Sequence, residues 1–500
     1  MKRGTLIATI LASAMTFIDG TVVNVALPAL QNGLDATITD VQWVIEAYAL
    51  FLGALILVGG ALGDQLGRKR VFLAGVFGFT AASVLCGSSP SPLVLIIGRA
   101  LQGIGAAFLV PGSLAIITAA FSGVERGRAI GTWSGFSAIT TAIGPVLGGW
   151  LVEHVTWRAV FFINVPLSAI VVFLAFRYID ESKDPSRGRT IDWLGAALAV
   201  IGLSGVIFGL LEWPALGGTP LVLTALAVGI AALVAFIVVE MRVHNPMLPP
   251  GLFSSRTFTL ANLLTFFLYA ALAEAMFMIP LELIQVRGYS ATAAGAALLP
   301  FPIIMFVLSR WSGGLVARIG SRVPLTVGPI VTGIGFALCV RVAGHAPFVS
   351  TFLPAIIVVG LGMAIAVAPL TTTVMDSVSG DHSGTASGIN NAVARIAGLV
   401  AIAVFGVIVA RTFNAQLTPR LDRVELSADA RAAVDRERPK MAGADVNSIP
   451  SLPPERRTDV RDAIDSSFAS AFRVSLFGVG LLALVAAAFG VAITPARSNT

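Results

Sequence analysis

Apolar stretches close to 20 residues long recur from one end of this 500-residue sequence to the other. A stretch of that length, coiled as an α-helix with a rise of about 1.5 Å per residue, spans the roughly 30 Å hydrocarbon core of a bilayer. Only 12% of the residues are charged, against about 25% in soluble domains. The sequence therefore predicts an all-α integral membrane protein.

Counting these stretches gives about fourteen transmembrane helices. The first stretch follows Lys2 and Arg3 and contains Ala12-Ser13-Ala14, features that also occur in cleavable signal peptides. Because its apolar run continues past that site to Pro28, a retained first helix fits better. We expect the spans near residues 5–28, 42–62, 71–88, 93–118, 130–151, 159–177, 192–212, 220–239, 257–281, 293–313, 323–343, 352–375, 386–411 and 472–494.

Basic residues are distributed unevenly between the two sides of this layout. If the N-terminus is cytoplasmic, sixteen Lys and Arg residues fall on cytoplasmic segments and three on the short loops opposite. The positive-inside rule therefore predicts that both termini are cytoplasmic and that residues 413–471 lie outside. These residues also account for the net charge of +6, so the lipid bilayer, and no nucleic acid, is the expected partner.

The long outer segment, residues 413–471, is rich in Arg, Asp, Glu and Ala. Its last part carries apolar residues at helical spacing, which predicts an amphipathic helix that runs into the last span. We interpret the rest as a solvated tether, with substrate capture or partner binding as the alternative. The spaced apolar residues are Val460, Ile464, Phe468 and Phe472.

Several landmarks in the sequence recur at one offset, which indicates an internal repeat. The pattern Gly-Thr-x-Ser-Gly occurs at 131–135 and again at 384–388, 253 residues later. Other positions keep the same separation: Gly60 and Gly313, Leu62 and Leu315, Gly67 and Gly320, and Cys86 and Cys339.

This offset matches spans 2–5 to spans 10–13, a period of eight helices that preserves orientation. Such a parallel repeat is typical of two six-helix halves related by an axis along the membrane normal, which leaves two helices as an insertion. We therefore divide the chain into an N-terminal half at 1–180, two inserted helices at 181–245, the first five helices of the C-terminal half at 246–412, the outer segment at 413–471, and the last helix with its tail at 472–500.

The most specific motif lies between the second and third spans and reads GALGDQLGRKR over residues 60–70. Gly60 and Gly67 permit a tight turn, Asp64 suits a helix end, and Arg68 and Lys69 anchor the cytoplasmic face. The motif is similar to a loop motif of the major facilitator superfamily, and the chain as a whole resembles the fourteen-helix drug:proton antiporter branch. The resemblance implies the major facilitator fold and a gating role for this loop; a plain basic turn is the alternative.

A second motif, Gly144-Pro145-Val146-Leu147-Gly148-Gly149, lies in the fifth span. Gly144, Gly148 and Gly149 leave room for a close helix neighbour, and Pro145 interrupts the ladder of helical hydrogen bonds. The motif resembles the antiporter motif of the same family, which implies export rather than uptake. A generic glycine packing seam is the alternative.

Three ionisable residues lie inside predicted spans, where a charge is costly and therefore indicates function. Asp19 is in the first span, Arg99 is in the fourth at a compatible depth, and Glu274 is in the ninth, close to the repeat offset from Asp19. We predict that Asp19 and Arg99 couple transport to protons, with Glu274 in a secondary role. A static structural ion pair is the alternative.

A cavity for small hydrophobic substrates or amphipathic cations should draw on aromatic and polar residues of the central spans, although aromatic residues at this frequency also serve in packing. The candidates are Phe17, Asn24, Gln102, Phe136 and Tyr269.

These features predict a transporter and not an enzyme, since no metal-binding cluster and no ATP-binding glycine loop occurs in the sequence. We expect proton-driven efflux of hydrophobic or amphipathic drugs or metabolites by alternating access, across the cytoplasmic (inner) membrane of a bacterium. The drive is the proton motive force, and no cofactor is needed. The resemblance leaves a periplasmic adaptor and an outer-membrane channel open as partners. A proton-coupled symporter for uptake, and an uncoupled envelope protein that handles lipid or acts as an assembly partner, are the alternatives.

Overall fold

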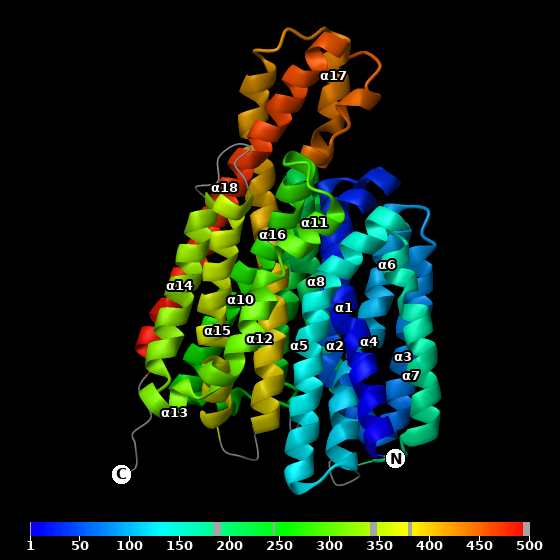
Figure 1. Ribbon diagram of the computed structural model, residues 1–500, viewed down its shortest axis with the longest axis vertical. Coiled ribbons are helices and arrows are strands. Elements are labelled where there is room, and N and C mark those ends of the chain that lie inside the picture. The colour runs from blue at the N-terminus through cyan, green and yellow to red at the C-terminus, as the bar shows by residue number, and fades with distance from the viewer. Residues whose placement is uncertain (1, 184–191, 244–245, 341–347, 379–382, 494–500) are drawn as a thin grey trace.

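Long α-helices that run side by side make up most of the chain (Figure 1). The structure, a computed structural model, describes residues 2–183, 192–243, 246–340, 348–378 and 383–493. In these ranges, thirteen helices are long and apolar enough to cross a membrane. The remaining predicted span, 130–151, lies within the 32-residue helix α5 (Gly123–His154), only part of whose side chains are described.

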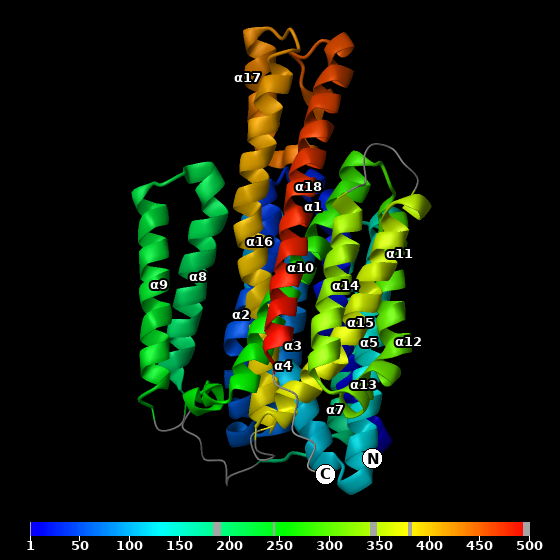
Figure 2. The ribbon, with the colours of Figure 1, turned by 90° about the vertical axis from the view of Figure 1, so that its left-hand side faces the viewer.

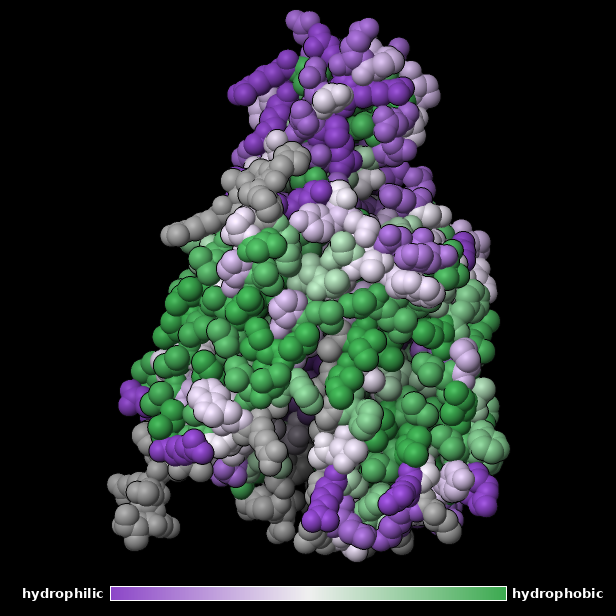
Figure 3. All heavy atoms as spheres, in the orientation of Figure 1, coloured by the Kyte–Doolittle hydropathy of each residue, from purple (hydrophilic) through white to green (hydrophobic). Residues whose placement is uncertain are grey.

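The outer surface of the bundle suits a bilayer. Figure 3 shows a broad belt of hydrophobic residues around the middle of the molecule and hydrophilic residues gathered towards both ends. Large apolar side chains such as Phe173 and Phe477 are 67% and 70% exposed, which is tolerable only against lipid.

The first six predicted spans form one set of helices. A capping box between Thr37 and Asp40 starts α2, and Ser91 with Pro92 starts α4. The predicted sixth span is divided at Ile163 into a short helix and a longer one. The helices are α1 (Lys2–Leu34), α2 (Ile38–Leu66), α3 (Arg68–Gly87), α4 (Pro92–Ala120), α5, α6 (Ala159–Phe162) and α7 (Asn164–Tyr178).

Two helices that follow stand apart at one side of the bundle (Figure 2). They are α8 (Trp193–Leu216) and α9 (Pro220–Glu240), which pack closely against each other. In the described part of the chain, the main contacts of this pair with other helices are those of α8 with α2 and with the later helix α16 (Ser383–Leu421).

The remaining spans form a second set. The span predicted at 293–313 is divided just before Pro300, which begins a new helix because its ring fits the first helical position. The elements are η2 (Pro250–Ser254), α10 (Arg256–Leu281), the π-helix η3 (Glu282–Val286), α11 (Ala291–Ala297), α12 (Pro300–Gly313), α13 (Leu315–Ile319), α14 (Arg322–Val340), η4 (Phe348–Ser350), α15 (Phe352–Asp376), α16 and α18 (Pro454–Ala492).

The sequence repeat has a counterpart in the packing. A Cβ atom added to Gly75 would lie 2.9 Å from the carbonyl oxygen of Gly105, so α3 and α4 touch at their backbones. A Cβ atom on Gly328 would likewise lie 2.8 Å from the carbonyl oxygen of Gly362, where α14 meets α15. The two glycine contacts occupy matching positions of the repeat. Cys86 and Cys339, also matching positions, are both free and buried.

Residues 412–471, which we call the cap, project from one end of the bundle (Figure 1). The cap contains the ends of α16 and α18, the helix α17 (Ala428–Glu437), and the short 3-10 helices η6 (Arg438–Gly443) and η7 (Val446–Ser448). The amphipathic helix predicted ahead of the last span is confirmed as the start of α18. The solvated tether predicted for the rest is wrong, because apolar side chains of the cap are buried in a core that is continuous with the core of the bundle. Buried residues include Val434, Ile449, Leu452, Val460, Ile464 and Phe468.

The cap is bound to the first set of helices at the end of α1. The side-chain amide of Gln31 donates to the Lys440 carbonyl oxygen at 3.0 Å and accepts from Gln285, beyond α10, at 2.8 Å. The ammonium group of Lys440 pairs with Asp35, just after α1. These bonds tie the cap across the boundary between the two sets of helices.

Candidate functional site

Asp19 and Arg99 form an ion pair in the interior of the first set of helices. The Nη1 atom of Arg99 lies 2.5 Å from the Oδ2 atom of Asp19, and their side chains are 2% and 0% exposed. The structure therefore brings together the two residues that their depths in α1 and α4 suggested. A pair buried this deeply is costly unless its remaining polar atoms are also satisfied.

Three further side chains complete a hydrogen-bond network around Asp19. The amides of Gln102 and Asn164 donate to the Oδ1 atom of Asp19 at 2.8 and 3.1 Å. Both amides also contact the hydroxyl oxygen of Ser83, at 2.8 and 3.2 Å. The network thus joins α1, α3, α4 and α7, and both carboxylate oxygens of Asp19 are in use.

Arg99 has partners besides Asp19. Its Nε atom donates to the carbonyl oxygen of Val44 in α2 at 2.9 Å, and its guanidinium lies 4.2 Å from the ring centre of Tyr48. A fixed, planar cation with several donors suits such a site better than lysine would. Arg99 therefore links α4 to both α1 and α2, and its position depends on the charge of Asp19.

The side chain of Asp19 is fully buried, but the next residue, Gly20, is not. Gly20 is exposed, and a Cβ atom added to it would meet no described atom within 4 Å. Open space thus reaches the residue next to the buried carboxylate.

Part of this network was not predicted from the sequence. Gln102 is predicted as a cavity residue, but the structure places it against Asp19 and Arg99. Ser83 and Asn164 are polar residues within apolar runs, and that interruption is a signal that could have identified them. The bond from Arg99 to Val44 uses a backbone oxygen, which every residue has, so it could not be predicted from the sequence.

The glycine motif of α5 sits at two helix contacts. A Cβ atom on Gly148 would lie 2.7 Å from the carbonyl oxygen of Val22 in α1, and one on Gly144 would collide with Thr21. On the other side, a Cβ atom on Gly149 would lie 2.6 Å from the Cα atom of Thr292 in α11. The carbonyl of Pro145 packs in the same way against Gly295, and α5 remains one helix across the proline. The motif is thus a close contact between the two sets of helices.

The loop motif at residues 60–70 forms a small charged cluster. Arg68 bonds to Asp64 through both its Nε and Nη2 atoms, at 2.9 and 2.8 Å. Gly67 adopts a φ of 120°, which favours glycine. Gly60 packs near Pro111 of α4.

Glu181, which was not predicted as a site residue, completes this cluster. Its carboxylate accepts from the backbone N–H groups of Lys69 and Arg70, at 3.1 and 3.2 Å, and so caps α3 where the helix dipole favours a negative charge. A side chain on Gly67 would meet this carboxylate at 2.7 Å. The cluster thus fastens the segment after α7 to the start of α3.

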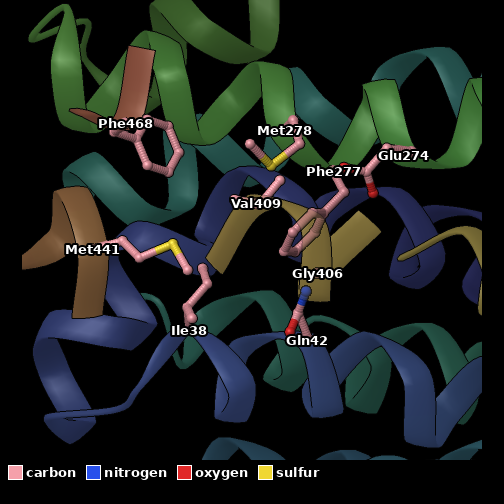
Figure 4. Close-up of a pocket in the computed structure, with 9 residues that line it drawn as sticks. All are labelled: Ile38, Gln42, Glu274, Phe277, Met278, Gly406, Val409, Met441 and Phe468. Atoms are coloured by element: carbon pink, nitrogen blue, oxygen red, sulfur yellow. The ribbon is translucent and has the colours of Figure 1, made fainter. Parts of the chain in front are cut away.

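Glu274 lies apart from Asp19, in α10 of the second set. It is 1% exposed and accepts a hydrogen bond from the hydroxyl of Ser475 at 2.7 Å. It lines an enclosed pocket between the two sets of helices (Figure 4).

The remaining predicted cavity residues do not share one site. Phe17 packs edge-on against Trp133, with ring centres 6.5 Å apart, and Tyr269 is half-buried against the core. Asn24 is half-buried and Phe136 is 48% exposed. None of them lines the pocket beside Glu274.

Comparison with known proteins places the chain in one family of transporters. The family model described as Major Facilitator Superfamily matches residues 9–402. Multidrug resistance protein Stp of Mycobacterium tuberculosis is 34% identical over 490 residues, covering 94% of this chain and 88% of that protein. Tetracenomycin C resistance and export protein of Streptomyces glaucescens is 30% identical over 493 residues, covering 97% and 90%.

Solved structures share the fold. A bacterial homolog of the human lysosomal transporter Spinster, in an inward-facing and unoccupied conformation, superimposes with a TM-score of 0.63 at 16% identity, covering 99% of both chains. A peptide transporter of the POT type, in complex with sulfate, superimposes with a TM-score of 0.63 at 13% identity, covering 98% of this chain and 94% of that one.

Proposed function

Because the chain belongs to the major facilitator superfamily of transporters, we propose that it exports small drug-like molecules from the cytoplasm in exchange for protons. Relatives that align over most of its length are named for resistance to, or export of, antibiotics. That naming supports drug efflux. The choice of protons as the driving ion rests on the chain's own residues.

The observation that carries the proposal is the buried network around Asp19. A proton that binds Asp19 cancels the charge that holds Arg99, and a neutral carboxyl cannot accept from Arg99, Gln102 and Asn164 as a carboxylate does. Loading and unloading of one proton therefore changes the bonds among α1, α2, α4 and α7.

Those bonds can be coupled to a change of access. The close contacts of Gly144 and Gly148 fasten α5 to α1 within the first half, and the contact of Gly149 on α11 holds the two halves together. In the proposed cycle, proton binding loosens α1 within its half, the α5–α11 contact parts, and substrate leaves on the cap side. At the other end, the Asp64–Arg68–Glu181 cluster fastens the segment after α7 to the start of α3 within the first half, and we assign it the role of a latch on the movement of these helices.

The proposed orientation puts the termini in the cytoplasm and the cap outside, as the positive-inside rule requires. A proton that moves inward then supplies about 1.4 kcal/mol per pH unit and about 2.3 kcal/mol per 100 mV. No cofactor is needed for this drive.

The test uses purified protein in vesicles with an imposed pH gradient and a fluorescent substrate. The natural chain should concentrate substrate against its gradient, in the direction opposite to proton flow. Asp19→Asn should lose this accumulation but still let substrate equilibrate down its own gradient. Accumulation by Asp19→Asn would refute the role of Asp19, and movement of substrate with protons would favour the symporter instead.

A further inference from the structure

The inserted helices α8 and α9 stand beside the line where the two halves meet (Figure 2). We call this line, along which α2 of the first half packs on α16 of the second, the seam. Gln42 in α2 donates to the carbonyl oxygen of Ile402 at 3.4 Å, and a Cβ atom on Gly388 in α16 would lie 3.5 Å from the Cδ2 atom of Leu57. Gln42 and Leu57 are 15 residues apart in one helix, so the seam runs for about 22 Å.

The helix α8 packs on both walls of the seam. Apolar side chains of α2, α8 and α16 form one buried cluster, separate from the main core. Leu50, Ile207 and Leu399, one from each of the three helices, are each at most 1% exposed. On this side of the molecule α8 therefore lies between the seam and the lipid.

The contact of α8 with α2 differs in kind from its contact with α16. The Nε1 atom of Trp43 in α2 donates to the Oε1 atom of Glu212 in α8 at 3.0 Å, and the Trp43 ring lies 6.3 Å from the ring of Phe208. Among the described residues, no hydrogen bond joins α8 to α16, which adds Leu399 and Ala403 to the cluster. A hydrogen bond in an apolar medium is strong and directional, whereas apolar side chains can slide past one another without breaking a bond.

The two inserted helices are joined closely enough to move together. A Cβ atom on Gly205 would lie 2.6 Å from the carbonyl oxygen of Ala225 in α9, and one on Gly229 would lie 2.9 Å from the carbonyl oxygen of Gly202 in α8. Glycines allow membrane helices to approach at their backbones in this way. Whatever holds α8 in place therefore holds α9 as well.

Alternating access requires the walls of the seam to shift, since α2 and α16 belong to different halves. A seam that parts directly beside lipid would admit acyl chains between the halves. A helix that stays fixed to one wall and overlaps the other would keep these chains out throughout the movement.

We propose that α8 and α9 form a lateral seal that is carried by the first half, with Glu212 as the positioning residue that holds α8 to Trp43 while α16 slides along α8. The seal excludes phospholipid acyl chains from the seam. The inference goes beyond the proposed export function, because it rests on movement of the halves and not on the substrate, the driving ion or the direction of transport.

The first test links α8 to one wall of the seam at a time. Cys86 and Cys339 are replaced by alanine in the full chain. Ile207→Cys is then combined with Leu50→Cys in α2 or with Leu399→Cys in α16, and copper phenanthroline forms the disulfide, which mass spectrometry identifies.

The readout is the downhill equilibration of a fluorescent substrate across vesicle membranes, which needs alternating access but no pH gradient. The link to α16 should slow equilibration at least about tenfold, with recovery on reduction, because α16 can no longer slide. The link to α2 is the matched control and should change the rate less than about twofold. Ile207→Cys alone, treated with the same oxidant, should transport normally.

The second test measures the seal directly with a phospholipid that carries a diazirine on its acyl chain. After photolysis of the natural chain, the label should appear on α9, where Leu221 and Ile230 are 60% and 56% exposed, and not on the buried cluster of the seam. Glu212→Leu removes the acceptor for Trp43 and should raise labelling of the seam at least about threefold, whereas Glu212→Gln keeps an acceptor oxygen and should leave the seam unlabelled.

Each outcome decides the matter. Inhibition by the α16 link alone, with an unlabelled seam in the natural chain, supports the seal. Inhibition by the α2 link, free exchange with the α16 link, absence of either disulfide, or label in the seam of the natural chain overturns it, and an unlabelled seam in Glu212→Leu overturns the role of Glu212. Because neither test imposes a pH gradient, both can succeed while the Asp19→Asn vesicles contradict proton coupling, and the reverse also holds.

Discussion

The buried Asp19–Arg99 pair should show strong coupling in a double-mutant cycle. Removal of one partner from a buried ion pair costs about 3–5 kcal/mol, because the other charge is left without compensation. Asp19→Asn adds a second fault, since its new NH₂ group must face either Arg99 or the donating amides of Gln102 and Asn164. Arg99→Gln leaves the carboxylate with its two amide donors only.

The double variant Asp19→Asn with Arg99→Gln removes both charges and leaves two amides that can bond to each other. We therefore expect it to be less destabilised than the sum of the single variants, by up to about 3 kcal/mol. Transport should not recover, since position 19 still lacks a titratable group. The contrast between regained stability and absent transport separates a structural role from a coupling role.

The chain supplies its own reporter for this measurement. Cys86 is 0% exposed, and its sulfur lies 3.7 Å from the Oε1 atom of Gln102, so a thiol-reactive dye labels it only when this region opens. With Cys339, the other free cysteine, replaced by alanine in every variant, labelling during denaturant unfolding in mixed micelles yields the free energy of unfolding of each variant. The matched cycle is Asp64 with Arg68, whose side chains are 21% and 14% exposed and whose coupling should be no more than about 1 kcal/mol. Additive losses at Asp19 and Arg99, within about 0.5 kcal/mol, would refute the reasoning.

Three other predictions follow from contacts described above. Gly149→Ala places a Cβ atom against the backbone of α11 and should reduce transport at least tenfold, whereas Gly131→Ala in the same helix meets open space and should be silent; vesicle efflux assays compare them. Asp64→Asn and Glu181→Gln weaken the latch at α3, so the transport rate should fall while equilibrium substrate affinity stays within about twofold; a large loss of affinity with normal turnover would contradict the latch. Burial lowers the pKa of Lys440, but its bonds to Asp35 and Glu437 outweigh burial, so that the pKa is raised. The contribution of Lys440 to cap docking is therefore full below the usual lysine pKa of about 10.4 and is lost only as pH rises above it. Spin-label distances between Asn32→Cys and Ser448→Cys should be constant from pH 6 to 9, and an undocked cap at neutral pH would count against the ion pair.

Much of the architecture could be predicted because lipid imposes a simple rule. Span lengths, the repeat and the amphipathic start of α18 all follow from where apolar residues recur, and burial of Phe468 and Phe472 agrees with their spacing. The meeting of Asp19 and Arg99 was predictable from depth alone, since two opposite charges at one level of a membrane have few other partners.

What could not be predicted depends on contacts between distant parts of the chain. Glu181 caps α3 although the two are separated by 112 residues of sequence, and Asn164 bonds to Asp19 although they are 145 residues apart. The folded cap is another case, because its charged composition resembles that of a tether and its few apolar residues act only once they meet. The pocket beside Glu274 draws residues from α2, α10, α16, α18 and η6, which no local pattern connects.

The great length of α16 and α18 has a mechanical consequence. Each has 39 residues, or about 58 Å at 1.5 Å per residue, so nearly half of each rod extends past a hydrocarbon core of about 30 Å. A stiff rod that pivots inside the bilayer is displaced most at the points furthest from its pivot, so a tilt of α16 or α18 in the lipid would be transmitted to the bonds that join the cap to the end of α1.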